Sequence, residues 1–171
     1  SLEVDALPDS RISVSREGLV SVLAEGTNRY AHGVLGDELE AGRIVVVDPV
    51  NAVVVGEVVI PEPSVIEGIA APWVDADGDG VDELLITISN SESGARLAIF
   101  DRSGEAVALG PPIGRGNRWR NQLGAGPTGS NGEIEVIDVR VPHIGGVVEY
   151  FRIDGDELVL QAERAGFTSH V

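Results

Sequence analysis

Residues 75–83 have the composition and spacing of a calcium-binding loop. The segment contains five acidic residues and two glycines and is followed directly by the apolar residues 84–86. Ca²⁺ takes about six to eight oxygen ligands, and a loop with acids at its first, third and fifth positions and glycine at its sixth supplies them with alternate side chains. The sequence therefore predicts a Ca²⁺ site with these ligands: Asp75, Asp77, Asp79, the carbonyl oxygen of Val81 and the carboxylate of Glu83, with Asp82 as the alternative to Glu83. The competing interpretation is a solvated acidic turn that holds no metal.

The residues after the loop argue against an EF-hand. An EF-hand requires a bidentate glutamate at the twelfth loop position and a helix on each side. The twelfth position here is Ile86, and residues 84–88 are mostly apolar and β-branched, which indicates a strand. We therefore expect a Ca²⁺ loop that leads into a β-strand.

The segment around this loop resembles a known repeat family. Residues 72–86, with the sequence Pro-Trp-Val-Asp-Ala-Asp-Gly-Asp-Gly-Val-Asp-Glu-Leu-Leu-Ile, are similar to an FG-GAP or VCBS-type repeat. Such repeats are the blades of integrin-alpha-like β-propellers. The resemblance implies that the loop joins the innermost strand of a blade to the next strand and holds one Ca²⁺. The similarity covers one blade of this chain.

The rest of the chain consists of short apolar segments separated by turns, so the sequence predicts an all-β protein. The expected strands are residues 12–15, 19–24, 30–35, 43–48, 52–60, 65–74, 83–89, 96–101, 106–109, 133–141, 147–153 and 157–162. Residues 37–41 are expected to form either one helical turn or a polar loop. Glycine, at 22 residues, and 9 prolines provide the breaks that many short strands need.

An internal repeat points to a β-propeller. Residues 43–48, 96–101 and 149–154 share a pattern that ends in aspartate, and 53 residues separate each aspartate from the next. A constant period of this length fits four-stranded propeller blades. We expect three blades at residues 27–64, 65–113 and 114–165, with residues 1–26 and 166–171 as parts of flanking blades.

About three and a half blades do not close a ring, because propellers usually have about four to eight. The ring is expected to close through a homodimer or through the rest of a longer chain, both favoured over completion of the last blade by the N-terminal strands.

The other two blades lack a complete Ca²⁺ loop. The counterpart in the third blade, residues 125–133, keeps glycines but has lost the acids, and residues 36–40 in the first blade are acidic but wrongly spaced. We expect these blades to hold their turns by hydrogen bonds alone.

Three segments place an aromatic residue shortly before a histidine or asparagine at the start of an apolar strand. These segments are residues 29–32, 118–121 and 166–170. In a propeller such positions could face the central channel, which makes the following residues ligand-binding candidates: His32, Arg120, Asn121 and His170. The alternative is that they cap strand ends and bond to a neighbouring blade.

Composition limits the partners. The net charge is −16, all 12 basic residues are arginine, and cysteine is absent. This balance disfavours binding to nucleic acids and anionic membranes. It favours binding to metal ions or cationic partners, or it serves only to keep the protein soluble. No apolar run is long enough to span a membrane. Since Ca²⁺ loops of moderate affinity work best where Ca²⁺ is plentiful, we expect an extracellular, cell-surface or periplasmic location.

Two classes of function remain open. The first is a calcium-stabilised, non-enzymatic propeller for ligand recognition, adhesion or scaffolding, with a protein or carbohydrate ligand. The second is the propeller domain of a carbohydrate-active hydrolase or lyase, although no nucleophile elbow, zinc-protease helix or phosphate loop is present. Aromatic residues in an exposed cleft would favour the second class, and buried aromatic residues would favour the first.

Overall fold

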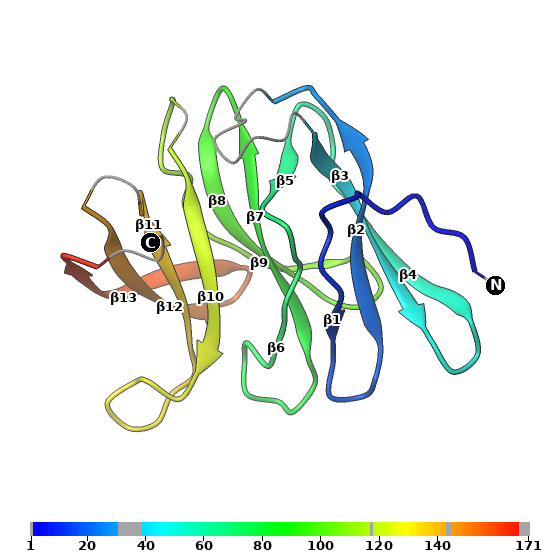
Figure 1. Ribbon diagram of the computed structural model, residues 1–171. Helices are drawn as coiled ribbons and strands as arrows, with labels where there is room; N and C mark the ends of the chain where they lie inside the picture. Colours follow the sequence, from blue (N-terminus) through cyan, green and yellow to red (C-terminus); the bar gives the residue numbers. More distant parts are fainter. Residues whose placement is uncertain (1, 31–38, 117, 143–144, 168–171) are drawn as a thin grey trace.

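The computed structural model describes residues 2–30, 39–116, 118–142 and 145–167. These residues form 13 strands and no helix (Figure 1). The strands are β1 (Ser13–Val14), β2 (Val20–Thr27), β3 (Glu40–Asp48), β4 (Val53–Val59), β5 (Val65–Glu67), β6 (Trp73–Val74), β7 (Glu83–Asn90), β8 (Gly94–Phe100), β9 (Ala106–Leu109), β10 (Arg120–Gly126), β11 (Glu135–Arg140), β12 (Val147–Asp154) and β13 (Glu157–Ala165). The all-β prediction is confirmed. In the part of the chain that the structure describes, no helix is long and apolar enough to cross a membrane.

The strands pair as three successive antiparallel meanders. The first meander is β1–β4 in order, the second has β5 and β6 both paired to β7 and continues through β8 to β9, and the third is β10–β13. One residue pair joins β3 to β5, Ala41 with Ile66, and another joins β9 to β13, Leu109 with Glu157. Because the second of these contacts is parallel, the whole is one mixed sheet that curls into a half-barrel (Figure 1).

One expected blade limit differs from the strand pairing. The limit between residues 26 and 27 lies inside β2, which pairs with β3 from Val20 opposite Val47 to Thr27 opposite Glu40. Residues 1–26 therefore contribute β1 and most of β2 to the same meander as residues 40–59. The glycine at position 26 suggests a break in the sequence, but it is part of β2 and pairs with Ala41, so the chain does not leave the sheet there.

The predicted repeat has a structural counterpart. Its three copies lie in β3, β8 and β12, each the third strand of its meander. Asp48 ends β3 and accepts hydrogen bonds from the backbone N–H groups of Val50 and Asn51 at 2.9 and 3.1 Å. Asp101 follows β8 and accepts from those of Ser103 and Glu105 at 2.8 and 2.9 Å. The aspartates recur because a carboxylate satisfies the N–H groups of a tight hairpin.

Two expected segments near the first loop fall largely outside the described residues. The strand expected at residues 30–35 lies there except for Tyr30, as do residues 37 and 38 of the possible helical turn. Within the described part, β3 starts at Glu40, so residues 40 and 41 are extended rather than helical.

Side chains fill the spaces between the meanders. The core between the first and second meanders includes Leu23, Ile44, Val46, Ile66, Leu84, Ile86 and Phe100. The core between the second and third includes Leu85, Leu97, Ile99, Val136, Phe151 and Leu158. Successive residues of β7 thus point to opposite cores, which explains why this strand is a continuous apolar run and not an alternating one.

Candidate metal centre

Loop 75–82 joins β6 to β7 and is folded by its own acids. Trp73 pairs with Leu84 and Val74 with Glu83, so the loop is closed at its base. Inside it, Asp75 accepts a hydrogen bond from Gly78 N at 2.8 Å and Asp77 accepts from Asp79 N at 3.0 Å. Gly78 and Gly80 have φ values of 84° and 92°, a left-handed conformation that glycine adopts without steric cost.

Three carboxylates of the predicted site converge. Asp75, Asp77 and Glu83 each offer one oxygen atom, and these atoms all lie within 4.8 Å of one another. Glu83 is 6% exposed and accepts a hydrogen bond from Ala76 N at 2.9 Å. Burial, with smaller effects from the charges of Asp77, Asp79 and Asp75, raises the pKa of Glu83 to about 7 against the opposing hydrogen bond from Ala76 N. Carboxylates gathered in this way fit a hard cation, which prefers oxygen ligands and offsets their repulsion.

The remaining predicted ligands lie outside this trio. Asp79 accepts a hydrogen bond from Val81 N at 2.7 Å, and Val81 is 42% exposed. Asp82, the alternative to Glu83, accepts from Arg16 through the backbone N at 2.6 Å and the side-chain Nε at 2.8 Å. Of the two competing acids, the structure brings Glu83 to the trio and turns Asp82 toward Arg16.

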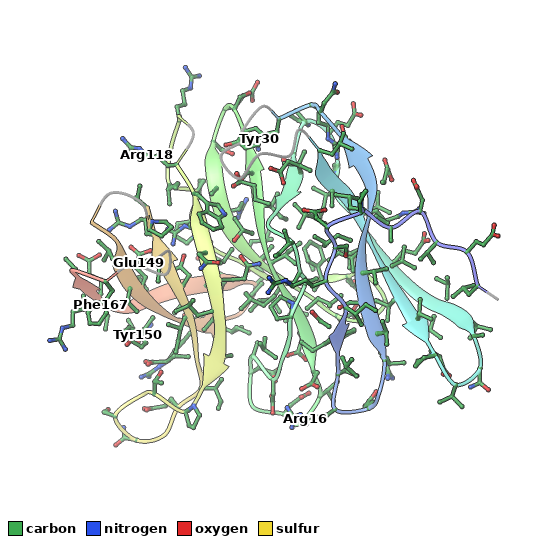
Figure 2. All side chains as sticks on the ribbon, viewed as in Figure 1. Arg16, Tyr30, Arg118, Glu149, Tyr150 and Phe167 are labelled. Carbon is green, nitrogen blue, oxygen red and sulfur yellow. The ribbon has the colours of Figure 1, made fainter. Side chains whose placement is uncertain are left out.

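Arg16 links the candidate centre to the first meander. It lies in the turn between β1 and β2, and its guanidinium is 3.0 Å from Asp75 and 2.8 Å from Asp82 (Figure 2). Burial alone would raise the pKa of Asp75, but hydrogen bonds from Arg16 and from the backbone of Gly80 and Gly78 together lower it. Sequence reasoning missed this contact, which spans 66 residues.

The third meander has an equivalent loop with a different source of positive charge. Loop 127–134 joins β10 to β11, and Gly126 pairs with Glu135 just as Val74 pairs with Glu83. Glu135 is 5% exposed and is bound by Arg152 at 3.0 Å and by the hydroxyl of Thr128 at 2.7 Å. The same guanidinium lies 3.5 Å from Glu133. Hydrogen bonds hold this loop, as expected, and those from Arg152 also bring a positive charge to its acids, which was not foreseen from the sequence.

The second meander has no such arginine at the matching place. In the third meander Val136 pairs with Phe151, and the next residue along β12 is Arg152. In the second, Leu84 pairs with Phe100, and the next residue is Asp101. Among the described residues no arginine forms an ion pair with Glu83. The strand opposite Glu135 thus carries Arg152, whereas the equivalent position in the second meander carries an acid, Asp101.

The four ligand-binding candidates are not brought together in the described part of the chain. His32 and His170 lie outside the described residues. Arg120 is 4% exposed and binds Asp138 and Glu149 at 2.6 Å each, with its guanidinium 5.6 Å from the centre of the Phe151 ring. Its guanidinium is therefore committed to carboxylates.

Asn121 is half-buried in β10 and pairs with Val139 of β11. The buried ion-pair cluster beside it was not predicted. The available signal was the opposed pair Asp138 and Glu149, two acids at inward-facing positions of strands whose neighbouring inward residues are apolar.

A groove of about 670 Å³ adjoins the candidate centre. It is lined by residues of β1, β6 and β10 and by the acids Asp75 and Asp82. Among the tryptophans and tyrosines, whose exposure bears on the choice between the two classes of function, Tyr30 is 4% exposed, and Trp73, Trp119 and Tyr150 are half-buried. Trp73 lines the groove while packing against the core between the first and second meanders.

Comparisons with protein-family models, with curated proteins and with solved structures return no match for this chain.

Proposed function

We propose that this chain is a calcium-stabilised module of the β-propeller type that serves ligand recognition, adhesion or scaffolding without catalysis. The observation that carries the proposal is the convergence of Asp75, Asp77 and Glu83 within 4.8 Å around a buried glutamate. A divalent cation would supply at Glu83 the charge that Arg152 supplies at Glu135.

The propeller part of the proposal is supported by the order of the strands. Three meanders follow one another, the repeated hairpin occupies the third strand of each, and apolar faces pack between them. The acidic loop lies between β6 and β7, at the start of its meander, as the resemblance to FG-GAP and VCBS-type repeats leads us to expect. A second copy or further repeats of a longer chain would complete the ring.

A protein or carbohydrate ligand and a location outside the cytoplasm belong to the same proposal. The net charge of −16 supports both indirectly, because it disfavours nucleic acid and suits a calcium-rich medium. The enzyme alternative gains no support at the groove. Its two lining acids, Asp75 and Asp82, both pair with Arg16, so neither is free to act as the acid or base of glycoside cleavage.

Thermal unfolding in Ca²⁺ and in chelator tests the metal. At a Ca²⁺ concentration about 100 times the Kd, binding adds about 2.7 kcal/mol to the free energy of unfolding. For a domain of this size that corresponds to a rise in Tm of roughly 5–10 °C. Asp77→Asn is expected to abolish the rise. Asp156→Asn, the same charge change in an exposed hairpin turn, is expected to keep it. Equal Tm values for the wild type in Ca²⁺ and in chelator would end the proposal.

Terbium luminescence locates the ion. Trp73 is two residues before Asp75, so its indole can sensitise Tb³⁺ bound in the loop. We expect sensitised emission that Ca²⁺ displaces and that Trp73→Phe removes. Trp119→Phe is the matched control, because Trp119 precedes the start of β10, whereas loop 75–82 lies beside loop 127–134 at the other end of that strand.

A further inference from the structure

One strand from each of the three meanders lines the same groove. Val14 of β1, Trp73 and Val74 of β6, and residues 123–126 of β10 form its walls. Figure 1 shows β6 between β1 and β10, with the three strands side by side. The groove is thus lined by these strands together with residues of the adjoining turns, among them Arg16, Asp75 and Asp82.

Two walls of the groove are free sheet edges. β1 and β10 are the two ends of the strand order, so in the described residues β1 pairs only with β2 and β10 only with β11. An edge strand presents N–H and C=O groups along one side that have no ladder partner, and an extended chain can pair with them.

The backbone of β10 is open toward added atoms. A Cβ placed on Gly124 or Gly126 would meet nothing within 4 Å. Gly126 also lies outside the left-handed φ region, so neither conformation nor packing requires glycine there. Because the Cβ of a strand residue points out of the plane of the sheet, the absence of a side chain at Gly126 leaves space over the face of β10 where it lines the groove.

Charge favours a basic occupant. The groove holds Asp75 and Asp82 against the single positive charge of Arg16, and Asp77 and Asp79 of the same loop add to the negative potential. The chain as a whole carries −16. A neutral sugar would gain nothing from this negative potential, and Trp73, the aromatic residue of the groove, is half-buried against the core.

We infer that this groove binds an extended peptide segment with basic side chains, and that the segment pairs with the free edge of β10. The inference names the ligand class of the recognition role proposed above and rests on that role. It does not require the calcium ion.

The probe is a fluorescein-labelled hexapeptide, Val-Arg-Val-Arg-Val-Arg, followed by fluorescence anisotropy at physiological salt. At about 3.3 Å per residue its extended length is roughly 20 Å, close to that of β10. The all-glutamate analogue, Val-Glu-Val-Glu-Val-Glu, is expected to bind at least tenfold more weakly. Two further analogues carry N-methyl groups on every valine or on every arginine. Since alternate residues of a strand face the same neighbour, one of these two is expected to lose binding at least tenfold.

A filled groove provides the complementary test. Gly126→Leu is expected to weaken binding of the peptide at least tenfold, and Ala106→Leu, at an exposed position of β9, is expected to leave it unchanged. Amide chemical shifts of the wild-type protein give a measurement that does not depend on any variant. The shifts that move on titration should cluster in residues 13–16, 73–75 and 123–127.

Three results would overturn the inference. The first is equal binding of all peptides, including both N-methylated ones, and the second is peptide binding that Gly126→Leu leaves intact. The third is that the peptide does not bind, whereas an oligosaccharide such as cellohexaose or chitohexaose binds and Gly126→Leu removes its binding. Each titration is run in Ca²⁺ and in chelator. A Ca²⁺-dependent Tm with no peptide binding rejects this inference alone, and peptide binding by a protein whose Tm is the same in Ca²⁺ and in chelator rejects only the metal.

Discussion

Asp138 is a buried carboxylate in which only one of the two oxygen atoms has a hydrogen-bond partner among the described residues, and this burial raises its pKa. Its Oδ2 atom is 2.6 Å from Arg120, but its Oδ1 atom has no hydrogen-bond partner in the described structure, and the side chain is fully buried. Arg120 also forms an ion pair with Glu149, which in turn pairs with Arg140 at 2.6 Å. Two acids thus share one buried guanidinium. Burial, with a smaller effect from Glu149, raises the pKa of Asp138 to about 6 despite the attraction of Arg120.

This shift predicts a specific pH dependence. Between its ordinary value of 3.8 and its raised pKa of about 6, Asp138 binds more protons in the folded protein than in the unfolded chain. Its contribution to the free energy of unfolding therefore falls as the pH rises through that window, by about 3 kcal/mol in total. Urea unfolding in metal-free buffer from pH 4 to pH 7 should show this difference between the wild type and Asp138→Asn. Parallel profiles would contradict the assignment.

At the scale of elements, two loops at equivalent positions of their meanders lead to buried acidic side chains, but different charges surround these acids. Loop 75–82 leads into β7 and loop 127–134 leads into β11, and both end at a buried glutamate. Loop 127–134 carries its own cation in Arg152, which sits opposite Glu135. Loop 75–82 adds acids in place of the arginine, so its negative charge is left for Arg16 and for an ion from solution.

Removing the built-in cation is expected to destabilise the third meander. Arg152→Met leaves Glu135 buried without its ion pair, and since Arg152 is one-third exposed we expect a loss of about 1–3 kcal/mol in the free energy of unfolding. Replacing Glu135 by Gln in the same protein should recover part of the loss, because the uncompensated charge is then gone. Denaturant unfolding of the two single variants and the double variant measures the coupling. Strictly additive losses would contradict it.

At the scale of the whole molecule, side chains rather than backbone ladders hold the meanders together. Each junction has one ladder pair, whereas the two core clusters bury most of the large aliphatic residues. The first junction is also tight at backbone level. An added Cβ on Gly56 of β4 would lie 1.9 Å from the carbonyl oxygen of Arg102, in the hairpin after β8. The first and second meanders therefore approach more closely than any side chain at this point allows.

Two glycine-to-alanine variants distinguish a steric clash from a change in backbone conformational entropy, because each affects the free energy of unfolding differently. Gly56→Ala is expected to lower the free energy of unfolding by about 1–3 kcal/mol, since the hairpin at Arg102 must move. Gly126→Ala, also in a strand and also outside the left-handed φ region, meets nothing within 4 Å and is expected to be neutral or to stabilise by up to about 1 kcal/mol. Calorimetry of both variants checks the contrast, and equal effects would rule out the tight junction.

The sequence by itself determined what depends on a few neighbouring residues. The strands around Pro49 and Gly104, the hairpin aspartates Asp48 and Asp101, and the convergence of acids in loop 75–82 all follow from interactions within a few positions of the chain. Such patterns are visible because alternation, turn residues and ligand spacing are local properties.

Only the tertiary structure decided which charges meet. Asp82 turns to Arg16 across 66 residues, Glu135 pairs with Arg152 across 17, and Arg120 becomes buried between Asp138 and Glu149. The groove along β1, β6 and β10 exists because the sheet curls and brings both of its edges to one place. The contact of Arg16 and the groove depend on how the meanders are stacked, whereas the ion pairs of Arg120 and Arg152 depend on the register of β10, β11 and β12, which no local pattern encodes.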